Sequence, residues 1–195
     1  MNLKSLFGIF YKNINVKKES FLNNILKIKF TNPISYIWLK RRQYIVKKIL
    51  KKSRVLDIGC GEHKIIHEAI GLDLHSYKNI DIISDAENIP FSNESFDSVV
   101  ILEVIEHLKN PEKAIKEIYR ILRKRGQVII STPNVNFSWK IIWWLWSHTF
   151  GRKWLNLHTN EFNEITLVKL FSKYFKTKNI RKVNHWILIL EGIKM

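Results

Sequence analysis

VLDIGCG, residues 55–61, is the stretch that decides the fold class of this chain. An apolar strand that ends in a turn with two glycines is typical of the carboxyl edge of an open α/β sheet, where such folds bind their ligands. Glycine suits this turn because its backbone adopts positive φ and because it has no Cβ in the way of a ligand. The carboxylate of Asp57, just before the turn, suits a cationic group on that ligand.

The sequence after Arg54 alternates between short apolar runs and helical patterns, which predicts a mostly parallel sheet with helices on both faces. The predicted strands are 54–58, 69–74, 80–84, 96–102 and 127–131. Asn110 and Pro111 begin a predicted helix that Gly126 ends, and its apolar face is Ile115, Ile118 and Leu122. Another helix is expected over 162–175, and the runs 179–183 and 186–192 predict an antiparallel pair.

The composition divides the chain near Ser53. We expect a basic helical extension over residues 1–52, with one or two short helices in 3–30 and an amphipathic helix that begins at Asn32 and Pro33. Its apolar stripe is Ile34, Trp38, Ile45 and Ile49. Residues 53–195 should form one domain, with an aromatic insert at about 135–160, because 195 residues that are 46% hydrophobic suffice for one substantial core.

The positive charge of the chain is concentrated in its first part. Residues 1–54 hold 14 Lys/Arg and one acid, Glu19, so they carry +13 of the formal net charge of +16. Such asymmetry predicts attraction to an anionic surface, either acidic lipid headgroups or nucleic acid. The alternative is a set of solvated helix faces with no charged partner.

Cysteine usage and hydropathy indicate a cytoplasmic protein. The single cysteine, Cys60, has no partner for a disulfide and no companions for a zinc site. The apolar run 6–11 is too short for the core of a signal peptide, and no segment has the roughly 20 apolar residues of a membrane span. We expect a cytoplasmic location, with contact to the cytoplasmic face of a membrane as an option.

Acids stand at the carboxyl ends of three successive predicted strands, at Asp57, Asp73 and Asp85. At the end of the second strand a carboxylate can accept both hydroxyls of a ribose, and an acid after the third can meet an adenine amino group. The competing interpretation is a dinucleotide loop of the Gly-x-Gly-x-x-Gly type. Its third glycine position, counted from Gly59, holds Lys64, which argues against a dinucleotide.

With these segments the sequence resembles class I S-adenosylmethionine-dependent methyltransferases, in particular the ubiquinone/menaquinone-pathway subgroup. The resemblance rests on VLDIGCG (55–61), GLDL (71–74), DAENIPFSNESFDSVV (85–100), LEVIEHLKNP (102–111) and GQVIISTPN (126–134). It implies a Rossmann-like, seven-stranded, mostly parallel sheet and S-adenosyl-L-methionine as cofactor. By position it implies that Asp57, Gly59 and Gly61 hold the methionine end, Asp73 the ribose, Asp85 and Ala86 the adenine, and that Glu103 faces the sulfonium.

The sequence departs from this family pattern directly after Gly61. The family commonly has a Thr/Ser/Pro-Gly pair and a longer helix there, whereas this chain has Glu62-His63-Lys64. Asp73 lies only 12 residues beyond Gly61, so we expect a short first helix. The donor's carboxylate would meet free amides at the start of that helix.

His107 is the candidate general base, because imidazole titrates near neutrality and the segment follows the fourth strand beside the cofactor. The alternative is that His107 only packs at a helix start. Glu103, Glu106 and His107 resemble a divalent-ion arrangement of related O-methyltransferases. We nevertheless predict no metal-binding residues in this chain. His158 resembles a segment near the acceptor pocket in relatives and is a second candidate base.

The segment 137–146 lies where the family inserts elements that cover the substrate. It holds four tryptophans within eight residues, and Arg152, Lys153 and Trp154 follow. Such a surface suits a bilayer interface or a lipid-like acceptor, and the alternative is a lid helix packed on the core. We therefore predict a methyltransferase that acts on a small-molecule, lipid-linked or glycan-type acceptor, on oxygen. An RNA-directed enzyme and a non-catalytic partner subunit remain alternatives.

Overall fold

The computed structural model describes residues 33–51, 53–78, 80–149 and 159–195. The chain divides into two compact units, Met1–Ile37 and Trp38–Met195, and the second unit contains the sheet. Val46 of helix α3 (Pro33–Ile49) and Leu50, the residue just after the helix, are both buried against this sheet. The sheet unit therefore starts before the composition shift near Ser53. The helices expected in 3–30 lie outside the described residues.

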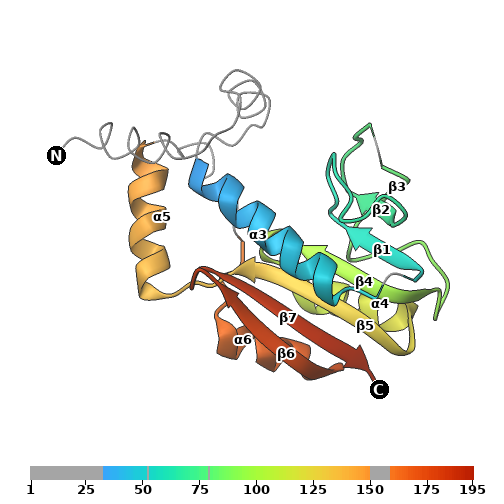
Figure 1. Cartoon of the computed structure of the whole chain (residues 1–195). Helices are drawn as coiled ribbons and strands as arrows, with labels where there is room; N and C mark the ends of the chain where they lie inside the picture. Colours follow the sequence, from blue (N-terminus) through green and yellow to red (C-terminus); the bar gives the residue numbers. More distant parts are fainter. Residues whose placement is uncertain (1–32, 52, 79, 150–158) are drawn as a thin grey trace. The chain divides into compact units, whose positions relative to one another are not determined.

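Seven strands form one sheet in the order β3-β2-β1-β4-β5-β7-β6 (Figure 1). Their bounds are β1 Val55–Ile58, β2 Ile70–Asp73, β3 Ile82–Ile83, β4 Phe96–Leu102, β5 Leu122–Pro133, β6 Phe175–Val183 and β7 Ile187–Lys194. The pairs from β3 to β5 are parallel, whereas β7 runs antiparallel to both β5 and β6. This confirms the predicted seven-stranded, mostly parallel sheet. The strand order reverses beside β1, and such a switch point is where open α/β sheets bind ligands.

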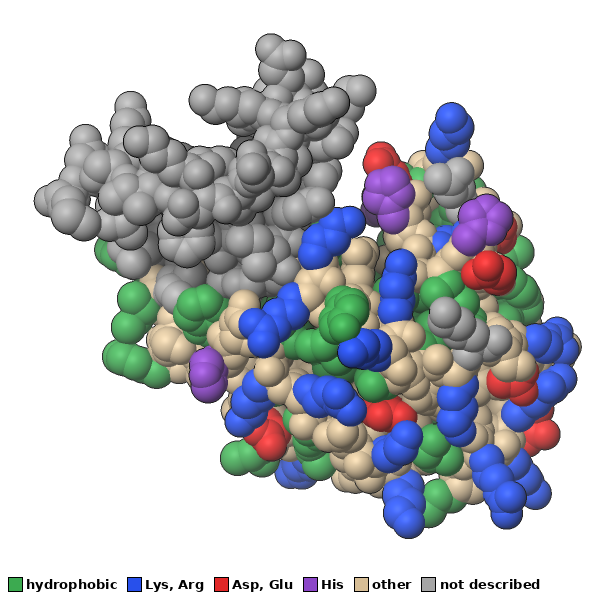
Figure 2. Space-filling model, in the orientation of Figure 1, with side chains coloured by type: hydrophobic (Ala, Val, Ile, Leu, Met, Phe, Trp, Pro, Cys, Tyr) green, Lys and Arg blue, Asp and Glu red, His purple; other side chains and the backbone are tan. Residues whose placement is uncertain are grey.

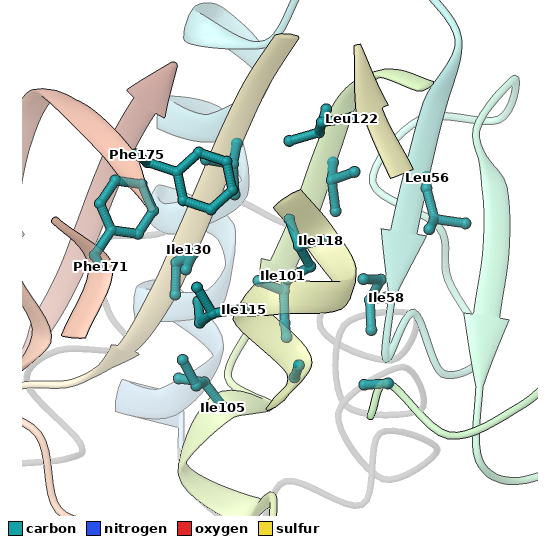
Figure 3. Packing of buried hydrophobic residues seen from close by; sticks show 14 of the residues in the cluster. Leu56, Ile58, Ile101, Ile105, Ile115, Ile118, Leu122, Ile130, Phe171 and Phe175 are labelled. Carbon is teal, nitrogen blue, oxygen red and sulfur yellow. The ribbon is translucent and has the colours of Figure 1, made fainter. Parts of the chain in front are cut away.

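The hydrophobic core has two layers because side chains alternate along each strand. Helices α4 (Pro111–Ile121) and α6 (Glu164–Phe171) pack on one face of the sheet, which includes Val128 and Ile130 (Figure 3). Helix α3 packs on the other face, which includes Ile129. The labelled members of the first layer are Leu56, Ile58, Ile101, Ile105, Ile115, Ile118, Leu122, Ile130, Phe171 and Phe175.

The two predicted helices are shorter than the sequence indicated. Helix α4 starts at Pro111 with Asn110 as its cap, as predicted, but ends at Ile121 and not at Gly126. Leu122 already has extended backbone and pairs with Phe96, so β5 begins there. Helix α6 spans Glu164–Phe171 within the predicted 162–175, because Asn163 forms its capping box and Phe175 starts β6.

The predicted short helix after Gly61 is wrong. The described residues 59–69, which connect β1 to β2, contain turns and bends and no helix. The connection is too short for a helical crossover, since only 11 residues separate Ile58 from Ile70. A ligand at this loop therefore meets no helix N-terminus. The free helix amides that were expected to bind the donor's carboxylate are absent from residues 59–69.

Candidate functional site

The loop after β1 requires glycine at its first position. Gly59 has φ +69°, and a Cβ built on it would come 2.2 Å from Cγ2 of Val104. Its N–H donates to the carbonyl of Leu72 at 2.7 Å, which holds the turn against β2. Gly61 also has a positive φ, +56°, but open space lies where its Cβ would be. The two predicted glycines therefore serve different purposes, close packing at Gly59 and backbone conformation at Gly61.

Asp57 is a buried carboxyl at the mouth of this loop. Its side chain is 3% exposed, and Oδ2 accepts the N–H of Ile65 at 2.6 Å. Burial raises the pKa of Asp57 to about 7, although the Ile65 N–H and the charges of Arg42 and Lys64 act in the opposite direction. Within the described part of the chain no side chain forms an ion pair with Asp57. A cationic ligand group beside Asp57 would favour its ionised form.

Asp73 and Asp85 occupy the ends of the next two strands, as predicted. Asp73 accepts the N–H of Gly61 on Oδ2 at 2.9 Å and the N–H of His75 on Oδ1 at 3.0 Å. These two bonds fix the carboxylate beside the glycine loop. Asp85 accepts the N–H of Glu87 at 2.8 Å and precedes the buried Ala86. The carboxyl ends of β1, β2 and β3 thus carry one acid each, along one edge of the sheet.

Glu103, just past β4, pairs with an arginine from α3. Its backbone has φ +56°, and its N–H donates to the carbonyl of Ser131 at 2.9 Å. Oε1 accepts the hydroxyl of Ser131 at 2.7 Å and lies 3.2 Å from Nη1 of Arg42. A left-handed conformation in a non-glycine residue is strained and frequently marks a functional position. Here it turns the Glu103 side chain toward the α3 face of the sheet.

Arg42 is the site residue that the sequence analysis missed. It is 8% exposed, and its Nε is buried without a hydrogen-bond partner among the described residues. Its charge acts on the pKa values of both Asp57 and Glu106, which places it among the acids of the site. A signal was present, since position 42 falls on the apolar stripe of Trp38 and Ile45 at helical spacing. A buried arginine with an orphan donor is suited to an anionic ligand group.

Glu106 and His107 lie on the 3-10 turn η1 (Ile105–His107) that follows β4. Glu106 is 2% exposed and accepts the hydroxyl of Thr132 at 3.2 Å. Burial, and then the charge of Glu103, raises the pKa of Glu106 well above its ordinary value. The His107 side chain is 39% exposed, with Nε2 at 4.0 Å from Oε1 of Glu106. The two candidate roles of His107, base and packing residue, stay predictions.

The structure does not assemble Glu103, Glu106 and His107 into a metal site. Their carboxylates contact Ser131 and Thr132, which are consecutive on β5 and therefore point to opposite faces of the sheet. Across residues 33–149 and 159–195, apart from the gaps at 52 and 79, no group of three His, Cys, Asp or Glu side chains is arranged to hold a metal ion.

Side chains of α4 hydrogen-bond to the backbone of the segment that follows Asp85 and Ala86. Arg120 donates to the carbonyls of Ile89 and Phe91 at 2.9 and 2.6 Å, and it forms an ion pair with Glu117 at 2.7 Å. Glu117 in turn accepts the N–H of Ile89 at 3.0 Å. This pair therefore fixes the path of the chain just after Ala86.

The aromatic insert begins and ends at the same edge of the sheet. Its helix, α5, spans Phe137–Thr149. At its start, the side-chain amides of Asn134 and Asn136 both donate to the carbonyl of His185 at 2.9 Å. At its end, Thr159 and Asn160 donate their backbone N–H groups to the carbonyl of Glu106 at 3.0 Å. Residues 150–158, including His158, lie outside the described part.

Comparison with known proteins agrees with this geometry. A family model described as a methyltransferase domain matches residues 31–174. A ubiquinone biosynthesis O-methyltransferase of Pseudomonas putida (strain GB-1) is 31% identical over 131 residues, which cover 54% of this chain and 53% of that protein. A probable S-adenosylmethionine-dependent methyltransferase of Mycolicibacterium smegmatis is 30% identical over 122 residues, covering 52% and 48%. The chain spans about half the length of the curated relatives it matches.

Solved structures share the fold at lower sequence identity. A SAM-dependent methyltransferase of Thermotoga maritima, described as a possible histamine N-methyltransferase, superposes with a TM-score of 0.62 at 21% identity, and the match covers 78% of this chain and 87% of that one. The [4+2]-cyclase SpnF superposes with a TM-score of 0.62 at 14% identity, covering 79% and 80%. The second likeness shows that the fold alone does not decide the reaction.

Proposed function

The chain belongs to the methyltransferase domain family, and from this premise we propose that it transfers a methyl group from S-adenosyl-L-methionine. The observation that carries the proposal is Asp57, a buried carboxyl without an ion-pair partner in the described residues, at a glycine loop whose third dinucleotide position holds Lys64. Such a loop suits a cationic donor and gives a pyrophosphate no cradle.

The amino-acid end of the donor has an ammonium and a carboxylate, and the site has a complement for each. Asp57 would hold the ammonium, with Gly59 shaping the turn against Val104 and Gly61 leaving open space beside it. Arg42 would hold the carboxylate, because its buried Nε has no hydrogen-bond partner among the described residues. We propose this arginine in place of the helix amides that the sequence analysis expected.

The nucleoside end would follow the next two strands. Asp73 is oriented by two amide N–H groups and, as a carboxylate, has acceptor positions left for the ribose hydroxyls. Asp85 and the buried Ala86 would meet the adenine. Glu103 follows β4, which pairs with β1 on the side away from β2, and would face the sulfonium.

Arg120→Met tests whether α4 positions the adenine segment. We expect the free energy of unfolding to fall by about 2 kcal/mol, because a charged, partly buried hydrogen-bond set is lost. The affinity for S-adenosylhomocysteine should fall about tenfold as residues 85–91 loosen. Calorimetry measures the affinity, and Lys116→Met, an exposed site on the same helix, is the matched control. If the affinity for S-adenosylhomocysteine were unchanged in Arg120→Met, the contacts of Arg120 would not be needed to position the adenine segment.

Methyl transfer is an in-line displacement at a carbon that the bound sulfonium activates. The residues that hold both ends of the donor supply alignment, which can account for most of the acceleration. For a hydroxyl acceptor, His107 is the proposed base that removes the proton. The O-methyltransferase names of relatives support an oxygen atom of the acceptor as the atom that is methylated. The aromatic insert at the edge of the site supports a lipid-linked, glycan-type or other small-molecule acceptor.

Incubation with methyl-labelled cofactor and a fractionated cell extract tests the reaction. We expect label in the lipid or small-molecule fraction, and none with Asp73→Ala. Label confined to RNA would instead support the RNA-directed alternative. An absence of label together with tight S-adenosylhomocysteine binding would support a non-catalytic partner subunit.

The affinity for S-adenosylhomocysteine should depend on pH through Asp57. Because the pKa of Asp57 is about 7, its carboxyl is protonated below pH 7, and it must lose that proton before it can pair with the ammonium of the ligand. We therefore expect the dissociation constant to rise by up to about tenfold per pH unit below pH 7 and to level off above it. Calorimetric titrations from pH 5 to pH 8, at pH values about one unit apart, measure how the dissociation constant changes with pH. A flat profile in the wild-type protein would contradict a titration of Asp57 near pH 7 that is coupled to donor binding.

A further inference from the structure

Helix α5 presents an apolar stripe to solvent. Phe137, Ile141 and Trp144 are 81%, 45% and 60% exposed, and their spacing of four and three residues places them on one face of the helix. Figure 2 shows exposed hydrophobic side chains along the edge where Figure 1 places α5. Large apolar residues that gather in this way on a surface mark an interaction site.

Basic residues accompany this stripe, and one acid, Glu161, forms an ion pair with Lys140 of α5 at 3.6 Å. Neither α3 nor α5 contains an acidic residue, and Figure 2 shows Lys and Arg side chains across the face that carries α3. The exposed ones in this part of the chain are Lys40, Arg41, Lys47, Lys48 and Lys51. A partner of this surface is therefore anionic where it meets α3 and apolar where it meets α5.

The hairpin turn between β6 and β7 connects the two helices. Arg41 on α3 donates to Oδ1 of Asn184 at 2.8 Å. Trp186, two residues further, donates its indole N–H to the hydroxyl of Ser138 in the first turn of α5 at 3.2 Å. One short segment thus contacts the basic helix and the start of the apolar stripe, so both can meet one continuous partner.

We propose that this combined surface docks on a lipid bilayer with anionic headgroups, the stripe of α5 inserting at the interface and the basic face of α3 meeting the phosphates. Tryptophan at the depth of the headgroups and Lys/Arg beside it are the composition that such helices use. A nucleic acid fits the stripe less well, because Ile141 has no ring on which a base could stack. The docking rests on the proposed function and deepens it, since the insert that contains α5 begins and ends at the sheet edge where the donor would bind, and a bilayer there would deliver a lipid-like acceptor.

Flotation with vesicles tests the docking without any turnover. We expect the full chain to float with vesicles of phosphatidylcholine and phosphatidylglycerol, less with phosphatidylcholine alone, and less at high salt. The double variant Ile141→Asp, Trp144→Asp should lower the bound fraction at least about tenfold, because charged groups replace the apolar contact. Ile165→Asp is the matched control, since Ile165 is 78% exposed on α6, outside the stripe.

Three outcomes would overturn the proposal: no flotation of the wild-type protein on anionic vesicles, an equal loss with Ile165→Asp, or binding of RNA in a parallel shift assay without binding of vesicles. Calorimetry with S-adenosylhomocysteine is run on every variant. Retained affinity shows that the double variant is folded and that the donor site is intact. Loss of flotation with intact donor binding therefore concerns the docking surface alone, and failure of donor binding in the wild-type protein concerns the proposed function.

Discussion

Gly59→Ala is expected to destabilise the protein by about 3 kcal/mol and to abolish binding of S-adenosylhomocysteine. The new Cβ would lie 2.2 Å from Cγ2 of Val104, a stiff, β-branched side chain on the η1 side of the site. Overpacking of this kind costs about 1–3 kcal/mol, and a left-handed backbone with a Cβ adds about 1 kcal/mol. Urea unfolding and calorimetry measure the two effects.

Gly61→Ala is the matched control for that substitution. Gly61 also has a positive φ, but nothing lies within 4 Å of its added Cβ. We therefore expect only the conformational cost, about 1 kcal/mol. If both variants lost the same stability, close packing against Val104 would not be the reason for glycine at position 59.

Asp57→Asn should weaken donor binding and stabilise the empty protein at the same time. The ion pair with the ammonium is lost, and we expect a fall in affinity for S-adenosylhomocysteine of about 100-fold. The amide oxygen can still accept the N–H of Ile65, so the loop keeps its hydrogen bond. Calorimetry at pH 8 measures the affinity.

The stability effect follows from the raised pKa of Asp57, about 7 against an ordinary 3.8. The folded state binds a proton in this range that the unfolded state has released, so the free energy of unfolding of the wild type falls as pH rises from about 4 to about 7. The variant lacks this slope. We expect it to be more stable than the wild type at pH 8, by on the order of 2 kcal/mol, with a smaller difference at pH 4. A variant that melts lower than the wild type at both pH values would contradict this.

Much of the sheet could be predicted because its signals are local. The apolar runs of β1 and β4, and the acids that end β1, β2 and β3, are each contained in a few consecutive residues. The cap Asn110 and the start Pro111 of α4 are equally local. The acids lie at one edge because parallel strands end there, which follows from the topology once the alternation of strands and helices is recognised.

The remainder depended on contacts between distant segments. Leu122 fits the apolar periodicity of α4, and only its pairing with Phe96 shows that it belongs to β5. Arg42 is fifteen positions before Asp57, and its burial depends on how α3 packs on the sheet, which composition does not reveal. Glu103, Glu106 and His107 resemble a metal-binding arrangement in the sequence, but the two carboxylates accept the hydroxyls of Ser131 and Thr132, which point to opposite faces of β5.

The central claim is that the loop of Asp57, Gly59 and Gly61 holds a cationic, phosphate-free nucleoside donor. Calorimetric titration of the wild-type chain with S-adenosylhomocysteine, and separately with NAD, tests it most directly. We expect saturable binding of one S-adenosylhomocysteine per chain and no heat of binding with NAD. Binding of NAD, or no binding of S-adenosylhomocysteine, would contradict the claim.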